Sequence, residues 1–576
     1  MKLSREEASK SRRSGADREA EVKDFRLLPA GEAAVVVELG NAIDPALNAR
    51  VRALDAALAR EPFPGLLETI PTYRSLLVFF DPLVSDASER SRHLSRLASA
   101  TSVHERQSSA IREVPVVYDG EDLDDVAHRH GISREDVVSL HTGSEVTAFM
   151  LGFVPGFAYM GLVPEAIATP RRETPRTRVP AGSVGIAGRQ TGIYPASTPG
   201  GWNLIGRSAV RLFDPDRDPP SFFQPGDRVR FVSVPDAEPY VPWTPSPSTA
   251  SKKGEPALEV LDGGLLTTVQ DLGRTGYQRF GVPVAGAVDA PSLRAANDLV
   301  SNPVGDAALE CTVTGPVLRV LRPLLLAVTG ADLEPVLERA DLGRWKVPMW
   351  TSFFARPGNV LSFAGRLSGC RAYVAVSGGV AVPEVLGSRA TFMMSGLGGF
   401  MGRRLQAGDV LRGYAIERAA AGASLAEARK AEAGRRWPER WRPSMTGEAI
   451  LRVVLGPQAD YFTEDAIEDF LQSSFVLAPT SDRMGCRLEG PPIRHKGEKE
   501  IVSDGMFAGA VQVPPDGKPI VMLSDRATTG GYPKIATIIG CDLPKVGQLV
   551  PGDTLRFTSM DVEEARAAAL EALRVP

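Results

Sequence analysis

The sequence predicts a mainly β protein with a small α+β domain at its N-terminal end, and three observations support this fold class. From about residue 148 onward, short apolar runs alternate with Gly and Pro, a pattern typical of barrels and sandwiches. The motif Gly-Asp-x-(Val/Leu)-x occurs three times, at Gly226, Gly408 and Gly552. This repetition predicts three related β units that end near residues 234, 416 and 560. Before them, strand and helix patterns alternate.

Length, charge and cysteine content exclude several classes of function. A chain of 576 residues suffices for three or four domains. The net charge of -4 and the lack of a basic tail argue against a nucleic-acid partner. The four cysteines show no Cys-x-x-Cys spacing, so we expect neither a disulfide framework nor a metal site.

The N-terminal residues 1–24 mix basic and acidic side chains, and we expect them to form a disordered tail. They lack the apolar core of a signal peptide. No apolar run approaches the roughly 20 residues that span a bilayer. The sequence therefore predicts a cytoplasmic protein without a membrane partner.

Residues 25–110 form the predicted α+β domain. A strand is expected at residues 34–39, and Asp44 followed by Pro45 is typical of a helix start. Four apolar residues then fall on one helical face: Leu47, Val51, Leu54 and Leu58.

Residues 111–234 are predicted to form the first barrel. Two short helices around Gly131 could form a helix-turn-helix. The acidic run at 121–125 would repel the phosphates of DNA, so we reject DNA binding. The Pro-, Ser- and Thr-rich stretch 235–256 reads as an inter-domain linker.

The second half of the chain shows the same pattern of short apolar runs separated by Gly and Pro. We expect a β unit at residues 257–416, a helical connector at 417–447 and a further β unit at 448–576. The last unit ends in a helix expected from about residue 562 to 573.

Two related loops stand out as candidate functional segments. Residues 525–532 place two hydroxyls, two glycines and an aromatic between apolar strands, and residues 197–202 repeat this construction. Such glycines let backbone approach a ligand and are expected at positive φ, although an ordinary hairpin turn is the alternative. We interpret the chain as two halves that build one cleft, each contributing one loop.

Further polar residues gather beside glycines in other segments. Arginines next to exposed backbone N–H groups suit the recognition of carboxylate or phosphate. The predicted catalytic residues are Arg176, Arg178, Gln270, Asp271, Arg274, Asp482, Arg483, Asp525, Arg526 and Thr529. The predicted substrate- and nucleotide-binding residues are His141, Ser183, Gln190, Thr198, Gly200, Gly201, Trp202, Gln512, Thr528, Gly530, Gly531 and Tyr532.

Familiar catalytic signatures are absent from the sequence. It contains no phosphate-binding G-x-x-x-x-G-K-(S/T), no H-E-x-x-H and no G-x-S-x-G. A glycine-rich loop at residues 396–402 misses the dinucleotide-binding spacing and reads as a barrel corner. His141 has a core or loop role as its alternative interpretation.

Several long motifs carry a family resemblance. Residues 152–159 (GFVPGFAY) and 199–206 (PGGWNLIG) closely resemble the B subunit of 5-oxoprolinase, also described as KipI or allophanate hydrolase subunit 1. Residues 268–274 (TVQDLGR), 481–485 (SDRMG) and 528–532 (TTGGY) resemble the C subunit, which is the KipA or allophanate hydrolase subunit 2 family. The resemblance implies tandem cyclophilin-like β-barrels and a gene-fusion joint at the linker.

The resemblance implies two enzymatic functions. In one, the fused B and C subunits work with a separate A subunit of 5-oxoprolinase to open 5-oxoproline to glutamate, with ATP and Mg as cofactors. In the other, the chain is the carboxyltransferase part of a biotin-dependent urea carboxylase. This sequence has neither a biotin carboxylase region nor a Met-Lys-Met motif, which favours the oxoprolinase.

Two further functions of the family were weighed. Allophanate hydrolysis is disfavoured because the chain lacks the Ser-Ser-Lys amidase pattern. A regulatory protein that inhibits a histidine kinase is a third hypothesis, against which the intact polar loops argue. In the favoured reaction, phosphorylation of the lactam oxygen would create a better electrophile, and arginines and glycine N–H groups would stabilise the transferred charge.

Overall fold

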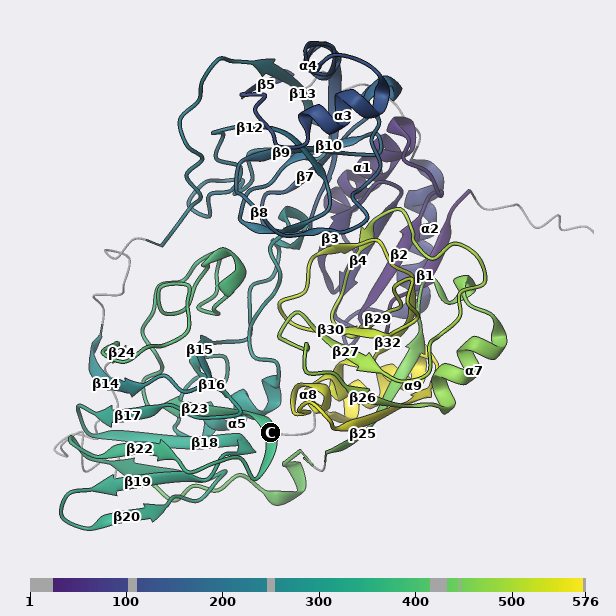
Figure 1. Ribbon diagram of the computed structural model, residues 1–576. Helices are drawn as coiled ribbons and strands as arrows, with labels where there is room; N and C mark the ends of the chain where they lie inside the picture. The colour runs from purple at the N-terminus through teal and green to yellow at the C-terminus, as the bar shows by residue number, and fades with distance from the viewer. Residues whose placement is uncertain are drawn as a thin grey trace, which may run out of the picture.

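A computed structural model describes residues 24–101, 111–245, 254–414, 433–443, 445 and 447–572. We refer to residues 24–101, 111–245, 254–414 and 447–572 as the N-terminal, second, third and fourth domains. Figure 1 shows the fourth domain beside the N-terminal sheet, with the third domain at the lower left and the second at the top. The predicted mainly β fold with tandem barrels and a preceding α+β domain is confirmed. The expected tail and most of the expected connector lie outside the described residues.

The N-terminal domain is a four-stranded antiparallel sheet covered by two helices. Asp44 caps the first helix by accepting a hydrogen bond from the N–H of Leu47 at 2.7 Å, as its sequence position predicts. Val51, Leu54 and Leu58 are fully buried on its inner face. The elements are β1 (Arg26–Pro29), β2 (Ala34–Glu38), α1 (Pro45–Arg60), β3 (Leu66–Pro71), β4 (Ser75–Phe80) and α2 (Ala87–Ala100), with strand order β1-β2-β4-β3.

The second domain is a seven-stranded sheet with two helices. Gly131 ends the first helix in the left-handed region at a φ of 65°, and Ser133 with Asp136 forms a capping box that starts the second. The elements are β5 (Ile111–Val116), α3 (Leu123–His130), α4 (Arg134–Thr142), β6 (Glu145–Leu151), β7 (Ala158–Gly161), η1 (Glu165–Ile167), β8 (Arg176–Val179), β9 (Ser183–Ala187), β10 (Gln190–Ile193), β11 (Thr198–Gly200), β12 (Asn203–Arg207) and β13 (Arg228–Ser233).

The third domain packs a six-stranded sheet on a five-stranded one around a Leu- and Val-rich core. Its first strand begins at Glu255, so the last residues of the predicted linker are paired in a sheet. The elements are β14 (Glu255–Asp262), β15 (Leu266–Gln270), η3 (Gln278–Phe280), α5 (Ala290–Leu299), β16 (Ala308–Thr312), β17 (Val317–Val320), β18 (Leu324–Asp332), β19 (Pro335–Arg339), β20 (Gly343–Lys346), β21 (Ser352–Ala355), β22 (Val360–Phe363), β23 (Ser368–Val376), η4 (Met393–Ser395) and β24 (Val410–Gly413).

The fourth domain is a closed seven-stranded barrel, preceded by the 3-10 turn η5 (Glu439–Trp441). Its strand order is β25-β32-β29-β30-β27-β26-β33. The elements are β25 (Glu448–Leu455), η6 (Ala459–Tyr461), α7 (Glu464–Gln472), β26 (Ser474–Leu477), β27 (Gly485–Glu489), β28 (Asp504–Gly505), β29 (Ala510–Gln512), β30 (Ile520–Met522), β31 (Thr529–Gly530), β32 (Lys534–Ile538), η7 (Gly540–Asp542), α8 (Leu543–Gly547), β33 (Thr554–Ser559) and α9 (Val562–Ala572). None of the described helices is long and apolar enough to cross a membrane.

The three Gly-Asp motifs form the same turn before the last strand of each β unit. The glycines have φ values of 96°, 90° and 95°, which favour glycine. Each following aspartate accepts a hydrogen bond from the backbone N–H three residues earlier, at 2.9, 2.8 and 2.9 Å. In the second and fourth domains the strand after the turn pairs in parallel with the first strand, whereas β24 pairs antiparallel with β14.

The N-terminal sheet packs directly on the fourth domain, so the two halves of the chain share a core. Val36, Ile70 and Leu77 contact Met506 and Phe507 across this boundary. A buried ionic network accompanies the apolar contact, and its members are Glu38, Arg74, Asp504 and Lys534. Ser75 Oγ and Gln458 Nε2 donate hydrogen bonds to Asp504, the carboxylate that pairs with Lys534.

The Gly-Asp turn gives a direct test of backbone strain. We expect Gly552→Ala to destabilise the protein by about 1 kcal/mol, because an alanine at a φ of 95° is strained while nothing lies within 4 Å of the added methyl group. Calorimetry of the full chain should show a melting temperature lower by about 2 °C. Gly497→Ala, also in open space but without a positive φ, is the matched control. Equal melting temperatures for both variants would contradict the strain.

Candidate functional site

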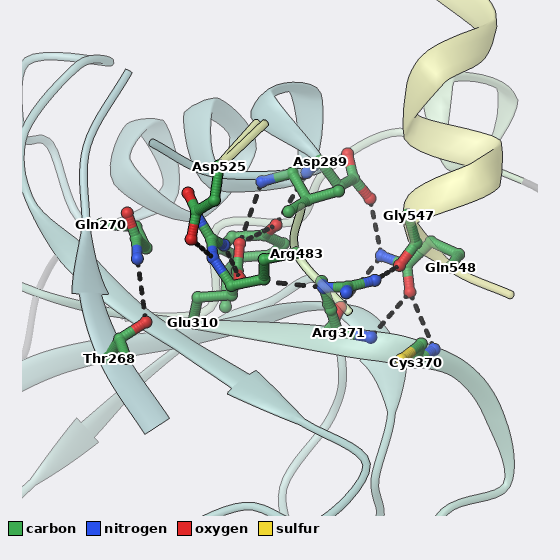
Figure 2. Close-up of polar contacts among 12 residues, drawn as sticks. Thr268, Gln270, Asp289, Glu310, Cys370, Arg371, Arg483, Asp525, Gly547 and Gln548 are labelled. Carbon is green, nitrogen blue, oxygen red and sulfur yellow. Dashed lines mark hydrogen bonds and ion pairs between the residues drawn. The ribbon is translucent and has the colours of Figure 1, made fainter. Parts of the chain in front are cut away.

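Asp525 starts the loop of residues 525–532 and is buried in a salt bridge. Arg483 Nε and Nη2 donate to its two oxygens at 2.9 and 3.0 Å. Arg483 Nη1 also donates to Glu310 of the third domain, and Nη2 donates to Gly286 O at 2.7 Å (Figure 2). Burial raises the pKa of Asp525, and the Arg483 charge opposes this rise. The loop is therefore tied to the third domain at its first residue.

Arg526, the next residue, links the loop to the N-terminal domain. Its Nη2 donates to Gln278 Oε1 at 2.5 Å, and Gln278 Nε2 donates to Glu68 Oε1 at 2.6 Å. Arg526 is 2% exposed, and burial lowers its pKa to about 10. The guanidinium therefore stays charged at neutral pH.

Thr529 links the same loop to the second domain. The N–H of Phe153 donates to Thr529 Oγ1 at 3.1 Å, and the threonine hydroxyl also hydrogen-bonds with Tyr159. The sequence suggests an accessible hydroxyl, but Thr529 is 4% exposed and its oxygen holds a backbone group of another domain. Positioning of the adjacent aromatic cluster is the role that this geometry favours.

The second loop, residues 197–202, lies on the other side of that aromatic cluster. The N–H of Arg172 donates to Gly201 O at 2.8 Å, which fixes the loop against residues 171–178. Trp202 is buried with three other aromatic rings at centroid distances of 5.4 to 6.4 Å: Phe157, Tyr159 and Tyr194. The two predicted loops thus both contact this aromatic cluster, through Thr529 and Trp202.

Arg171 is the cation that both loops share. It is exposed and makes no ion pair or hydrogen bond with the described residues. Burial raises the pKa of four tyrosines, and the charge of Arg171 opposes this rise in each: Tyr73, Tyr159, Tyr194 and Tyr532. Three belong to the first half of the chain and Tyr532 to the second, so the charge of Arg171 acts on tyrosines of both halves.

Among the buried polar atoms that have no hydrogen-bond partner in the described part of the chain, three belong to threonine and glutamine side chains in or beside the loops. They are Thr198 Oγ1, Gln512 Oε1 and Thr528 Oγ1. Buried polar groups are normally paired, so unpaired ones in one region are consistent with a site for a polar ligand. All three residues are among those predicted from the sequence, whereas Arg171 is not, because its only sequence signal is the cluster of arginines at 171–178.

The loop glycines were expected at positive φ, but none of them has a positive φ: Gly200, Gly201, Gly530 and Gly531. Packing explains two of them, because a Cβ at Gly200 would lie 2.5 Å from the Tyr194 hydroxyl and one at Gly530 would lie 2.5 Å from Met506 Cε. Gly201 and Gly531 have no atom nearer than 3.7 and 3.6 Å. A methyl group fits at these two positions, so the strain expected there was wrong.

The segment at 270–274 holds the third domain together. Asp271 accepts hydrogen bonds from the Ser388 hydroxyl and the Arg389 N–H, at 2.7 and 2.6 Å. Gln270 Nε2 donates to Thr268 Oγ1 at 2.9 Å (Figure 2), and Arg274 donates to the carbonyls of residues 385 and 390. Burial lowers the pKa of Arg274 to about 10. These contacts favour a structural role for all three predicted catalytic residues.

Several predicted residues of the second domain also have internal partners. His141 is fully buried, and its ring nitrogens contact the Tyr118 hydroxyl at 2.7 Å and Thr191 Oγ1 at 3.0 Å. Burial lowers its pKa to about 3, so it stays neutral at physiological pH. Arg176 is paired with Asp122 at 2.7 Å.

Three other predicted residues of this domain lie closer to the tyrosine cluster or its loops. Arg178 is exposed and donates to the Ser197 hydroxyl at 3.0 Å. Gln190 Nε2 donates to the Tyr73 hydroxyl at 2.7 Å. Ser183 is buried at the start of β9. Within the described residues, no group of three His, Cys, Asp or Glu side chains could hold a metal ion.

Two family models match the chain. The one described as carboxyltransferase domain, subdomain C and D, matches residues 25–223, and the one described as carboxyltransferase domain, subdomain A and B, matches residues 280–559. The 5-oxoprolinase B subunit of Bacillus subtilis is 40% identical over 227 residues, which cover 36% of this chain and 93% of that protein. The 5-oxoprolinase C subunit of Escherichia coli is 35% identical over 314 residues, covering 54% and 94%. The chain belongs to the families of the 5-oxoprolinase B and C subunits.

Other relatives place these two families beside urea-processing proteins. Urea amidolyase of Saccharomyces cerevisiae is 32% identical over 325 residues, or 54% of this chain and 17% of that protein. Among solved structures, TTHA0988 superposes with a TM-score of 0.79 at 37% identity, covering 91% of this chain and 99% of that one. The Kluyveromyces lactis urea amidolyase gives a TM-score of 0.51 at 32% identity, covering 56% and 20%.

The salt bridge between Arg483 and its two carboxylates should be structurally essential in this fused chain. We expect Arg483→Met to cost about 3 kcal/mol or more, because it leaves the buried Asp525 carboxylate without its cation and takes from Glu310 the nearer of its two arginines, Arg371 lying 3.8 Å away. Urea denaturation at pH 7 measures this loss. The exposed Arg487, on the same hairpin, gives Arg487→Met as the control.

The loss of unfolding free energy in Arg483→Met should also depend on pH. Without the guanidinium, burial raises the folded-state pKa of Asp525 further above the unfolded value. The folded variant then binds more protons than the unfolded chain. The loss of unfolding free energy relative to the unmodified chain should therefore be smaller at pH 5 than at pH 7. A deficit that is constant over this range would contradict the buried-charge explanation.

Proposed function

We propose that this chain comprises the fused B and C subunits of an ATP-dependent 5-oxoprolinase. In this proposal it works with a separate A subunit to convert 5-oxoproline to glutamate, and alone it is inactive. The observation that carries the proposal is that one chain matches 93% of a B subunit together with 94% of a C subunit. The four free cysteines support a reducing, cytoplasmic location.

The tyrosine cluster around Arg171 is the proposed substrate site. 5-Oxoproline is a small anion with an amide ring, so it needs one cation and neutral hydrogen-bonding or apolar neighbours. Arg171 has no partner among the described residues, and Tyr532, on which its charge acts, is partly exposed. Burial keeps the surrounding phenols neutral at pH 7 by raising their pKa, that of Tyr194 to about 12. Arg171 would bind the carboxylate, and the neutral phenols of the tyrosines would contact the rest of the molecule.

The same region fits the phosphates of ATP. Arg178 donates only to the Ser197 hydroxyl among the described residues and, like Arg171, is exposed, so both cations are available to phosphate oxygens. When bound, ATP supplies the phosphoryl group that activates the lactam oxygen. Mg²⁺ in such sites is held largely by the nucleotide phosphates and water, so it requires few protein carboxylates.

Reconstitution with the A subunit tests the proposed function. We expect the purified chain to release little phosphate from ATP alone, and the reconstituted mixture to hydrolyse ATP only when 5-oxoproline is present. Glutamate should form in step with phosphate. ATP hydrolysis at a rate independent of 5-oxoproline, or no hydrolysis at all in the reconstituted mixture, would contradict the proposal.

A carboxyltransferase is the second candidate, and the matched family descriptions favour it specifically. Under this alternative, biotin is the cofactor and urea the acceptor, as the name of the urea carboxylase relatives suggests. Carboxylation of urea that depends on bicarbonate, a biotinylated carrier and this chain would establish it.

Arg171 should determine the affinity for 5-oxoproline. We expect Arg171→Gln to raise the KM for 5-oxoproline at least about tenfold in the reconstituted enzyme, equivalent to about 1.4 kcal/mol, by removing the charge that faces the carboxylate. The melting temperature should not change, because the side chain is exposed and unpaired among the described residues. Arg189→Gln, an exposed arginine elsewhere in the second domain, is the control. An unchanged KM for Arg171→Gln would remove Arg171 from the site.

A further inference from the structure

A cavity of about 390 Å³ lies between the third and fourth domains, apart from the tyrosine cluster. Asp525 lines it, whereas Thr529 and Tyr532 at the other end of the same loop face the second domain and Arg171. The volume falls in the range of small-molecule sites, which is about 300 to 1,000 Å³. The proposed substrate site therefore does not account for it.

The wall of this cavity is mostly apolar and rich in methionine. Its apolar residues include Leu265, Phe392, Met393, Met394, Met484 and Leu549. Leu265, Met393 and Met394 are 56%, 40% and 36% exposed, so part of the wall is open to solvent. Flexible thioether side chains adapt to ligands of different shape, and exposed apolar groups around a hollow favour an apolar occupant.

The charged groups of the wall do not leave a free cation. Arg483 is bound by Asp525, Glu310 and the carbonyl of Gly286. Arg371 donates to Gly547 O and lies 3.8 Å from Glu310 (Figure 2). Two arginines thus face two carboxylates, and their charges cancel.

Asp482 adds one negative charge to this balanced set. It is exposed on the lining, its Oδ1 accepts the N–H groups of Met484 and Gly485, and it forms no ion pair within the described residues. The local charge is therefore negative by one. An anion entering the cavity would meet repulsion without a compensating cation.

We propose that this cavity is a second ligand site, which binds a small and mainly apolar molecule that is neutral or cationic. Carboxylates and nucleotides are excluded from it by the paired arginines and Asp482. The site goes beyond the proposed function, whose substrate and nucleotide are anions. Apolar burial supplies the affinity, and Asp482 selects against negative charge.

Three probes with the same phenylbutyl body separate apolar binding from charge selection: 4-phenylbutan-1-ol, 4-phenylbutan-1-amine and 4-phenylbutyrate. The full chain labelled with ¹³C at its methionine methyl groups reports binding by NMR, with signals assigned from single Met→Leu variants. We expect the alcohol and the amine to shift Met393, Met394 and Met484. Met506, buried at the boundary with the N-terminal domain, should stay unchanged. The carboxylate should bind at least about tenfold more weakly than the amine.

Two variants complete the test. Asp482→Asn should bring the affinities for amine and carboxylate to within about threefold of each other, while leaving the alcohol unchanged. Met484→Trp should fill the cavity and abolish the shifts of Met393 and Met394, with a calorimetric melting transition showing that the chain remains folded. The proposal is overturned if no probe shifts these methionines in the unmodified chain, if 4-phenylbutyrate binds as tightly as the amine, or if Met506 shifts as much as they do. All readouts are independent of 5-oxoprolinase activity, so they stand whether or not that function is established.

Discussion

The loop of residues 525–532 imposes the main constraint on this structure, because its buried polar side chains connect it, directly or through one further side chain, to the other three domains. Asp525 is held with Arg483 beside Glu310 of the third domain, while Arg526 reaches Glu68 of the N-terminal domain through Gln278. Thr529 binds a backbone N–H of the second domain. Burying such groups without partners costs several kcal/mol in total. The loop therefore reaches its observed conformation only when both halves of the chain are assembled.

The tyrosine cluster depends on that assembly. Tyr159 is positioned from one side by Thr529 of the second half and from the other by Trp202 of the first. The Arg171 charge then acts on phenols from both halves. Neither half alone would contain this arrangement, which gives a physical reason for the B and C subunits to be joined and for their separate relatives to act as partners.

Local chemistry could be predicted from the sequence, whereas long-range pairing could not. The Asp44 cap and the three Gly-Asp turns depend on contacts three residues apart, and both appear as the patterns indicate. The two candidate loops were predicted because their composition is unusual. Arg483 looked like a phosphate ligand because Glu310, its partner 173 residues away, has no local signature. His141 looked equally available, since its burial depends on helix packing against the barrel. Arg171 was not predicted, because an exposed arginine is ordinary in a sequence and its charge acts on tyrosines that are distant along the chain.

A single rule of charge compensation distinguishes the two ends of the 525–532 loop. At the Asp525 end, each arginine that lines the adjoining cavity has a carboxylate or carbonyl partner, so this cavity is apolar and offers no cation to an anionic ligand. At the Tyr532 end, Arg171 has no partner among the described residues and its neighbours are neutral phenols. The charge of each buried arginine is compensated inside the protein in the first case, whereas the charge of the exposed Arg171 faces solvent in the second. One short loop can thus separate a surface that attracts anions from one that repels them.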